Sequence, residues 1–271
     1  MIEVHTPFLD LTAIAGSGQC FRWQPLDGGY RIVAMRRAVA VRQPARDILR
    51  IACDRDEFQS VWKSYFDLDT DYRAIIDAVS PGDAYLAAAA AHGSGIRILR
   101  QEPWETLVTF LISQRKNIPA IRRAVEMLCA AAGDVIAEDA GGPVYAFPTP
   151  ERLLSLSDGE LAACSLGYRA PYVRAAAEAF CGGLRMDDFR AMDDPALLDA
   201  LCRLRGVGPK IAQCTMLFGF HRMNAFPVDV WMGRVSARHY PQGFPLEKYA
   251  PWAGVMQQYM FAYERFLEGK N

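Results

Sequence analysis

The chain has 271 residues, 51% of them hydrophobic, and is therefore long enough to bury a sizeable core in one large domain or two. No stretch approaches the ~18 apolar residues of a membrane span and the start lacks a basic signal region, so we expect a cytoplasmic protein. The formal net charge of −1 argues against attraction to nucleic acid by bulk charge, although a local basic face would suffice for DNA binding.

The N-terminal part of the chain predicts a small antiparallel sheet. Roughly the first 50 residues are expected to form strands, with an Asp-Gly-Gly turn at residues 27–29 and alternation that continues through residues 39–41. Residues 54–66 then predict a helix capped by Asp54, because large apolar side chains recur there at helical spacing.

Helical periodicity dominates the rest of the chain, and a Gly/Pro-rich loop is expected over residues 141–150. The expected helices cover residues 85–92, 104–113, 118–132, 150–156, 158–164, 170–181, 194–203, 209–220, 229–239 and 249–267. The predicted fold class is α+β, with a small N-terminal antiparallel sheet domain with helices (residues 1–100) followed by a mainly helical domain (residues 101–271).

The most informative segment is Leu-Arg-Gly-Val-Gly-Pro-Lys at residues 204–210. Gly206 and Gly208 allow positive φ and the close approach of another backbone. Pro209 suits the first position of a helix, whose free N–H groups can bind a phosphate. Lys210 is then the first long polar side chain of that helix.

A carboxylate, Asp229, follows this segment in the sequence. Asp229 stands nineteen positions after Lys210, behind another proline, where it can cap the next helix and have its negative charge stabilised there. An amine and a carboxylate brought together beside DNA indicate nucleophilic chemistry on a sugar.

This pattern resembles the helix–hairpin–helix DNA glycosylases, and three further segments extend the resemblance over nearly the whole chain. Residues 16–23, Gly-Ser-Gly-Gln-Cys-Phe-Arg-Trp, resemble a signature of the 8-oxoguanine DNA glycosylases, and residues 166–173 and 254–261 match two other family segments. The resemblance implies a base-excision repair enzyme of bacterial type, a monomer acting on double-stranded DNA that contains 8-oxoguanine, with its site between the two domains.

For catalysis, the resemblance implies that Lys210 attacks C1′ of the deoxyribose as the base leaves. The resulting Schiff base permits β-elimination, so the enzyme would be both glycosylase and AP lyase. Asp229 would stabilise positive charge on the sugar. The alternative interpretations are a solvated helix lysine and a simple helix cap.

A base pocket is expected from Gly18, Cys214, Gln257 and Phe261. Cys214 lies one helical turn after Lys210, and Phe261 lies one turn after Gln257, so each pair shares a helix face. The resemblance implies that the Gly18 carbonyl accepts the N7–H which distinguishes 8-oxoguanine from guanine, while Gln257 binds the Watson–Crick edge. The alternative is ordinary core packing.

The resemblance also implies contacts to the opposite base by Tyr168 and Arg169. Arg115 stands where the eukaryotic members have the first Asn of a wedge segment, and Ala120 stands where they have an arginine. These two departures predict looser selectivity for cytosine opposite the lesion.

The DNA backbone is expected to contact the amides of Gly206 and Gly208. Trp231, which stands where the eukaryotic members have a histidine, is expected to donate its N–H to a phosphate. The resemblance allows a monovalent cation at the hairpin. None of the seven cysteines follows Cys214 and no Cys-x-x-Cys pair occurs, so we expect no other cofactor, no metal and no iron–sulfur cluster.

Two rival functions stay open from the sequence. A monofunctional glycosylase of the same fold, acting on alkylated or mismatched bases, usually lacks the lysine after the hairpin. A non-enzymatic DNA-binding helix–hairpin–helix module would leave Asp229, Gln257 and Phe261 without a joint purpose.

Overall fold

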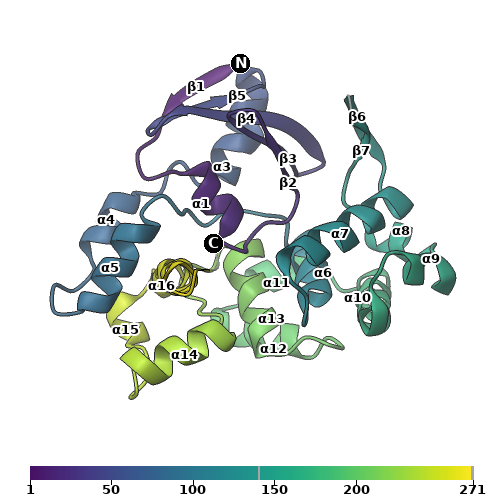
Figure 1. Cartoon of the computed structure of the whole chain (residues 1–271). Coiled ribbons are helices and arrows are strands. Elements are labelled where there is room, and N and C mark those ends of the chain that lie inside the picture. Colours follow the sequence, from purple (N-terminus) through teal and green to yellow (C-terminus); the bar gives the residue numbers. More distant parts are fainter. Residues whose placement is uncertain (140, 270–271) are drawn as a thin grey trace.

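The computed structural model describes residues 1–139 and 141–269, and in them a five-stranded antiparallel sheet lies above a larger helical body (Figure 1). The strand order is β1-β5-β4-β3-β2. The strands are β1 Ile2–His5, β2 Trp23–Leu26, β3 Gly29–Ala34, β4 Arg37–Ala45 and β5 Ile48–Ile51, with a separate hairpin of β6 Val135–Asp139 and β7 Gly142–Tyr145. The predicted α+β class is confirmed.

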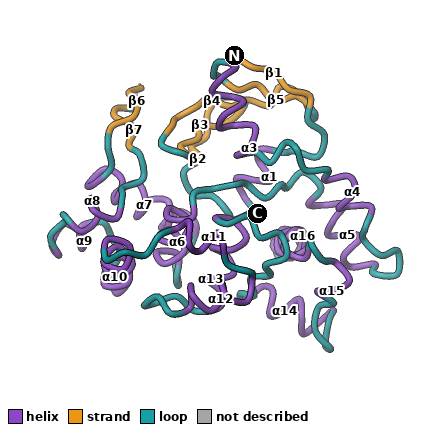
Figure 2. Tube along the Cα trace, turned by 180° about the vertical axis from the view of Figure 1, so that it is seen from behind, coloured by secondary structure: helices purple, strands orange, loops and turns teal. Residues whose placement is uncertain are grey.

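Helices make up most of the remaining chain (Figure 2), and two of them contain a π-helical stretch, η1 and η3. They are α1 Leu11–Gly16, α2 Arg55–Glu57, η1 Phe58–Trp62, α3 Lys63–Tyr65, α4 Tyr72–Asp77, α5 Ala84–Gly93, α6 Pro103–Ser113, α7 Ile118–Ala132, α8 Pro150–Leu154, α9 Asp158–Ala163, the 3₁₀ turn η2 Gly167–Arg169, α10 Ala170–Cys181, α11 Met186–Ala191, α12 Asp194–Cys202, α13 Pro209–Cys214, η3 Thr215–Gly219, α14 Val230–His239, α15 Leu246–Tyr249 and α16 Ala253–Leu267.

Most expected elements are confirmed to within a few residues. The turn at residues 27–29 joins β2 to β3, with Gly28 at φ 67°. The helix expected over residues 54–66 is present as α2, η1 and α3, and the carboxylate of Asp54 accepts a hydrogen bond from the Glu57 amide at 2.8 Å. A side-chain cap of this kind satisfies an amide that the first turn leaves unpaired.

Several elements differ from the expectation, among them helices α4 and α15, which were not expected. Helix α1 interrupts the region expected to be all strand, because Asp10 caps it and Leu11 and Ile14 bury on one face. The β6–β7 hairpin begins before the expected loop of residues 141–150 and occupies its first half. Helix α11 was not anticipated, since it has only six residues.

Two hydrophobic cores stabilise these layers. The smaller one lies between the sheet, α1 and the η1–α3 helix, and includes Trp23, Ile51 and Trp62. The larger one joins the remaining helices, including α5 and α16, which approach so closely that a Cβ on Gly93 would lie 2.8 Å from the Tyr259 ring. Helices α4 and α5 therefore belong to the core of the helical body, and α5 packs against α16, although both precede residue 100.

Within the described ranges, no helix is long and apolar enough to cross a membrane.

Candidate active site

A small cavity of about 50 Å³ collects every predicted catalytic and base-pocket residue. Its walls come from the loop after α1, from α6, from α13 with η3, from the segment before α14, and from α16. The lining residues are Ser17, Gly18, Phe110, Lys210, Cys214, Phe218, Pro227, Asp229, Gln257, Gln258 and Phe261. Segments up to 244 positions apart in the chain, from Ser17 to Phe261, thus meet at this cavity.

The hairpin turn presents Lys210 to this cavity. Gly206 has the expected positive φ, 84°, and a Cβ there would lie 2.4 Å from the Tyr172 ring. The expectation of positive φ is wrong for Gly208, which has φ −96° and forms the N-cap of α13. Gly208 is nevertheless exposed, and no atom lies within 4 Å of a Cβ built on it, so an outside backbone can approach.

Lys210 is half-buried, and its Nζ lies 5.1 Å from the centroid of the Phe110 ring. The ion pairs of the described residues include none between Lys210 and Asp229. The amine is therefore placed by its helix beside the Phe110 ring and the Cys214 thiol, and no ion pair with Asp229 fixes it.

The Cys214 thiol forms an apolar wall beside this amine. Burial raises its pKa to about 11, while the charge of Lys210 and a hydrogen bond from it act in the opposite direction. Cys214 is thus a neutral thiol at neutral pH and a poor nucleophile. Lys210 is the nucleophilic side chain that the cavity offers.

Asp229 is half-buried at the start of α14, where its Oδ1 accepts a hydrogen bond from the Met232 amide at 2.9 Å. The cap predicted from the sequence is confirmed. The capping bond and the helix N-terminus both stabilise negative charge on this carboxylate.

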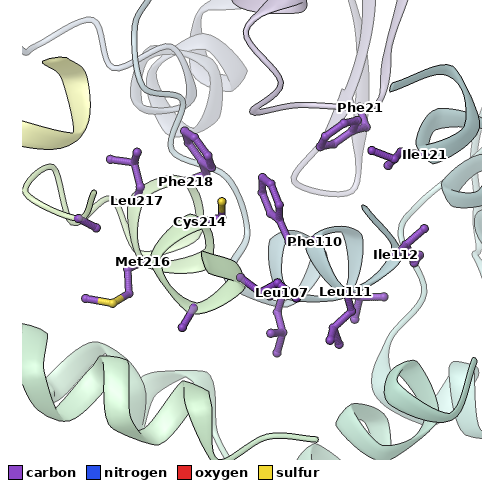
Figure 3. Close-up of a cluster of buried hydrophobic side chains, with 14 of the residues drawn as sticks. Phe21, Leu107, Phe110, Leu111, Ile112, Ile121, Cys214, Met216, Leu217 and Phe218 are labelled. Atoms are coloured by element: carbon purple, nitrogen blue, oxygen red, sulfur yellow. The ribbon is translucent and has the colours of Figure 1, made fainter. Parts of the chain in front are cut away.

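Two aromatic residues that the sequence did not single out complete the apolar wall. Phe110 and Phe218 stack with ring centroids 5.6 Å apart and planes at 17°, and Cys214 lies beside them (Figure 3). Phe218 follows Cys214 by one helical turn, so the same periodicity indicates it. Phe110 enters from α6, and only tertiary packing brings it here.

The loop that carries Gly18 forms another wall of the cavity. Gly18 has φ 76°, and a Cβ built on it would lie 3.7 Å from the Phe261 ring. Gln19, which is buried, anchors the loop by donating to the Arg97 carbonyl at 2.9 Å and accepting from the Leu99 amide at 2.8 Å. The glycine thus faces the aromatic ring expected to bind the base.

Helix α16 contributes two adjacent amides where the sequence predicted one. Gln257 and Gln258 are 3% and 4% exposed, and Nε2 of Gln258 donates to Oε1 of Gln257 at 2.9 Å. Gln258 was missed because a residue next to Gln257 is expected on a different helix face.

The predicted opposite-base residues lie outside the cavity on two neighbouring turns. Arg115 and Tyr168 are exposed, and Arg115 has φ 51°. Arg169 differs from the expectation, since it is buried. Its Nε donates to the Gln114 carbonyl at 2.7 Å and its Nη1 to the Leu166 carbonyl at 3.2 Å. In this conformation Arg169 joins the two turns, and an opposite base would have to displace these bonds.

Gln114 was also missed, and it connects these turns to the hairpin. Its carbonyl accepts from Arg169, and its Nε2 donates to the Gly206 carbonyl at 3.3 Å. Trp231 lies in the first turn of α14, with the Arg234 guanidinium 5.2 Å from its ring centroid. The described part of the chain holds no group of three or more His, Cys, Asp or Glu that could bind a metal ion.

Comparisons with known families agree with this arrangement. The model described as "8-oxoguanine DNA glycosylase, N-terminal domain" matches residues 1–107, and that of the "HhH-GPD superfamily base excision DNA repair protein" matches residues 108–244. Among curated relatives, an N-glycosylase/DNA lyase of Saccharomyces cerevisiae is 33% identical, over 69% of this chain and 53% of the relative. A probable N-glycosylase/DNA lyase of Methanothermobacter thermautotrophicus is 24% identical, over 95% of this chain and 93% of the relative. The match therefore spans about half of the yeast protein and nearly all of the archaeal one.

Solved structures match over nearly the whole chain. MBOgg1 in complex with a low-affinity DNA ligand superposes with a TM-score of 0.91 at 36% identity, covering 98% of this chain and 96% of the other. The Clostridium acetobutylicum 8-oxoguanine glycosylase/lyase, in complex with double-stranded DNA containing cytosine opposite 8-oxoG, has a TM-score of 0.89 at 33% identity, covering 97% and 93%. This chain belongs to the 8-oxoguanine DNA glycosylase family of helix–hairpin–helix base-excision repair proteins.

Proposed function

We propose that this protein is a bifunctional DNA glycosylase and AP lyase that removes 8-oxoguanine from double-stranded DNA. One observation carries the proposal: the amine of Lys210 and the carboxylate of Asp229 line the same small cavity as Gly18, Gln257 and Phe261. A nucleophile, a charge stabiliser and groups suited to a flipped purine are thereby combined. The names of the Clostridium and yeast relatives support the same activity.

In the proposed reaction, Lys210 Nζ forms a bond to C1′ while the C1′–N9 bond breaks, and the electron pair leaves with the base. The amine loses its protons, the sugar ring opens, and the product is an imine. Removal of a C2′ proton then expels the 3′ phosphate. Asp229 stabilises the positive charge that develops on the sugar.

The cavity must open to admit the base. A cavity needs roughly 10–15 Å³ to hold one water molecule, so the cavity of about 50 Å³ has room for a few waters and is too small for a purine. Phe261 is half-buried, whereas Gln257 and Cys214 are buried, so the Phe261 ring is the wall with most room to move. The extruded base would then stack between this ring and the Cys214 thiol.

Borohydride trapping on an 8-oxoguanine duplex tests the proposal. Wild-type protein should form a covalent complex, and Lys210→Gln should bind the duplex without being trapped. Lys63→Gln, a remote surface lysine paired with Asp69, is the matched control and should trap like wild type. Undiminished trapping by Lys210→Gln would contradict the assignment. Base release without any trapping would favour the monofunctional alternative.

We further propose that a monomer without a metal or an iron–sulfur cluster suffices, because the side chains of Lys210 and Asp229 supply the nucleophile and the charge stabiliser of the proposed reaction. Dialysis against a strong chelator should leave excision unchanged, and activity should sediment with the mass of one chain. Restoration of a lost activity by zinc or iron would contradict this.

A further inference from the structure

An unsatisfied amide lies at the proposed base pocket. Gln258 lines the cavity and is 4% exposed, and its Oε1 is buried without a hydrogen-bond donor anywhere in residues 1–139 and 141–269. A buried acceptor without a donor destabilises the folded state, so such atoms are rare unless a ligand satisfies them. Its helix neighbours Val255, Met256, Tyr259 and Met260 are all buried, and an apolar side chain would fit among them without this cost.

The hydrogen bond between Gln257 and Gln258 determines which donors and acceptors their side chains present to a base. Because Gln258 Nε2 donates to Gln257 Oε1 at 2.9 Å, the two amides lie side by side. An amide oxygen has two lone pairs, so Gln257 Oε1 can accept one more hydrogen bond. In the order of their atoms the two amides therefore present the donor Gln257 Nε2, the acceptor Gln257 Oε1, then Gln258 Nε2, one of whose protons already bonds to Gln257, and a second acceptor, Gln258 Oε1.

This order matches one edge of a purine. The Watson–Crick edge of guanine and of 8-oxoguanine presents the O6 acceptor, the N1–H donor and the 2-amino donor, in that order. The edge of adenine presents a 6-amino donor and the N1 acceptor and has no 2-amino group. A donor followed by two acceptors is therefore complementary to a guanine-type base.

We propose that Gln258 is a specificity-determining residue whose Oε1 accepts a hydrogen bond from the 2-amino group of the flipped base. Gln257 then donates to O6 and accepts from N1–H. The proposal rests on the proposed function, since it assigns one more contact in the same pocket. Gln257 Nε2 and Gln258 Oε1 are the outer atoms of the pair, with Gln257 Oε1 and Gln258 Nε2 between them. When Gln257 Nε2 donates to O6, Gln258 Oε1 therefore fits the 2-amino group at the other end of the edge and not N1–H in its middle.

The test compares 8-oxoguanine with 8-oxohypoxanthine, the same base without its 2-amino group, in otherwise identical duplexes. Single-turnover excision is measured for wild type and for Gln258→Met, a variant of similar size that lacks both amide atoms. Thr109→Val is the matched control, because Thr109 Oγ1 is another buried atom without a partner in the described chain, and it does not line the cavity.

Wild type should excise 8-oxoguanine about tenfold faster than 8-oxohypoxanthine, which is the effect of roughly one hydrogen bond. Gln258→Met should lose about tenfold on 8-oxoguanine and almost nothing on 8-oxohypoxanthine, while its thermal midpoint stays equal or rises. Thr109→Val should retain the wild-type preference.

Equal losses of Gln258→Met on both bases would overturn the proposal, since a purely structural residue does not respond to the 2-amino group. A wild-type preference near one would overturn it as well, and this result needs no variant to fold. The outcome is separate from the proposed function: excision of neither base by wild type would count against the proposed function, whereas the comparison of the two bases tests the role of Gln258.

Discussion

Arg265 donates a hydrogen bond of 2.7 Å from its Nη1 to the carbonyl oxygen of Gly16. The same guanidinium lies 5.5 Å from the centroid of the Phe261 ring, one helical turn earlier on α16. Burial lowers the pKa of Arg265, and the negative charge of Asp229 opposes that shift. One arginine thus connects the C-terminal helix to the loop that carries Gly18 and contacts the ring expected to move.

We expect Arg265→Met to slow single-turnover excision of 8-oxoguanine about tenfold, because loss of one charge-assisted hydrogen bond would free the Gly18 loop. Arg265→Lys, which keeps the charge, should lose less. Arg203→Met, which removes an exposed ion pair with Asp199 far from the cavity, is the control. Excision at the wild-type rate by Arg265→Met would show that the loop is held by Gln19 alone.

Alanine should affect stability at one hairpin glycine and DNA binding at the other. Gly206→Ala forces a non-glycine residue to positive φ and places a methyl group against Tyr172, so the free energy of unfolding should fall by about 2–5 kcal/mol. Gly208→Ala meets no atom within 4 Å and should cost less than about 1 kcal/mol. Its methyl group should instead keep a phosphate away and weaken DNA binding. Thermal unfolding and duplex titration separate the two effects, and equal loss of stability in both variants would contradict the interpretation.

Much of the fold could be predicted from the sequence, and so could the grouping of Lys210, Cys214 and Asp229 at one cavity. Lys210 and Cys214 share a face through simple helical periodicity, and Asp229 caps a helix as its surroundings indicated. Phe110 and Gln258 could not be predicted, since no local pattern says that α6 packs against η3 or that Gln258 turns toward its neighbour.

The conformation of Arg169 is a second limit of the sequence. The motif around Tyr168 indicates a DNA contact, yet the carbonyl that Arg169 contacts belongs to Gln114, 55 positions earlier. Backbone acceptors of this kind are invisible in a sequence, because every residue carries one and only the tertiary fold selects among them. Helix α1 was missed for another reason: it has only six residues, and Asp10 and packing under the sheet stabilise it.

Stability should depend on pH through Glu105, on α6. Burial raises the pKa of this carboxyl to about 7, with Arg22 acting in the opposite direction and Glu102 and Glu126 adding to the rise. The folded protein therefore favours the protonated form, so the free energy of unfolding should fall as pH rises from about 4.5 to 7. Glu105→Gln should be more stable than wild type above pH 7, by about 1–2 kcal/mol after allowance for partial exposure, and equal to it near pH 4. Denaturant titrations at pH 4.5, 6 and 8 check this, and a constant difference between the proteins would contradict it.

Recognition of the opposite base should be looser here than in the eukaryotic members of the family. By the resemblance, those enzymes read cytosine with an Asn and an Arg of the wedge segment, where this chain has Arg115 and Ala120. The Ala120 amide donates to the Asn117 side chain at 2.9 Å, so Asn117 caps α7. Arg169 donates to the carbonyls of Gln114 and Leu166. Arg115 is thus the exposed guanidinium on this turn.

We expect excision of 8-oxoguanine to prefer cytosine over adenine by less than a thousandfold. A good bidentate contact discriminates by about 1–3 kcal/mol, so loss of the family's second arginine should reduce the preference by roughly ten- to a hundredfold. Arg115 can donate to an acceptor on either base and so distinguishes them poorly. Single-turnover excision opposite each of the four bases measures the preference. Ala120→Arg should raise it, whereas Ala131→Arg, at an exposed position on the same helix, should not. A wild-type preference above a thousandfold would show that Arg115, Tyr168 and Arg169 suffice for cytosine recognition.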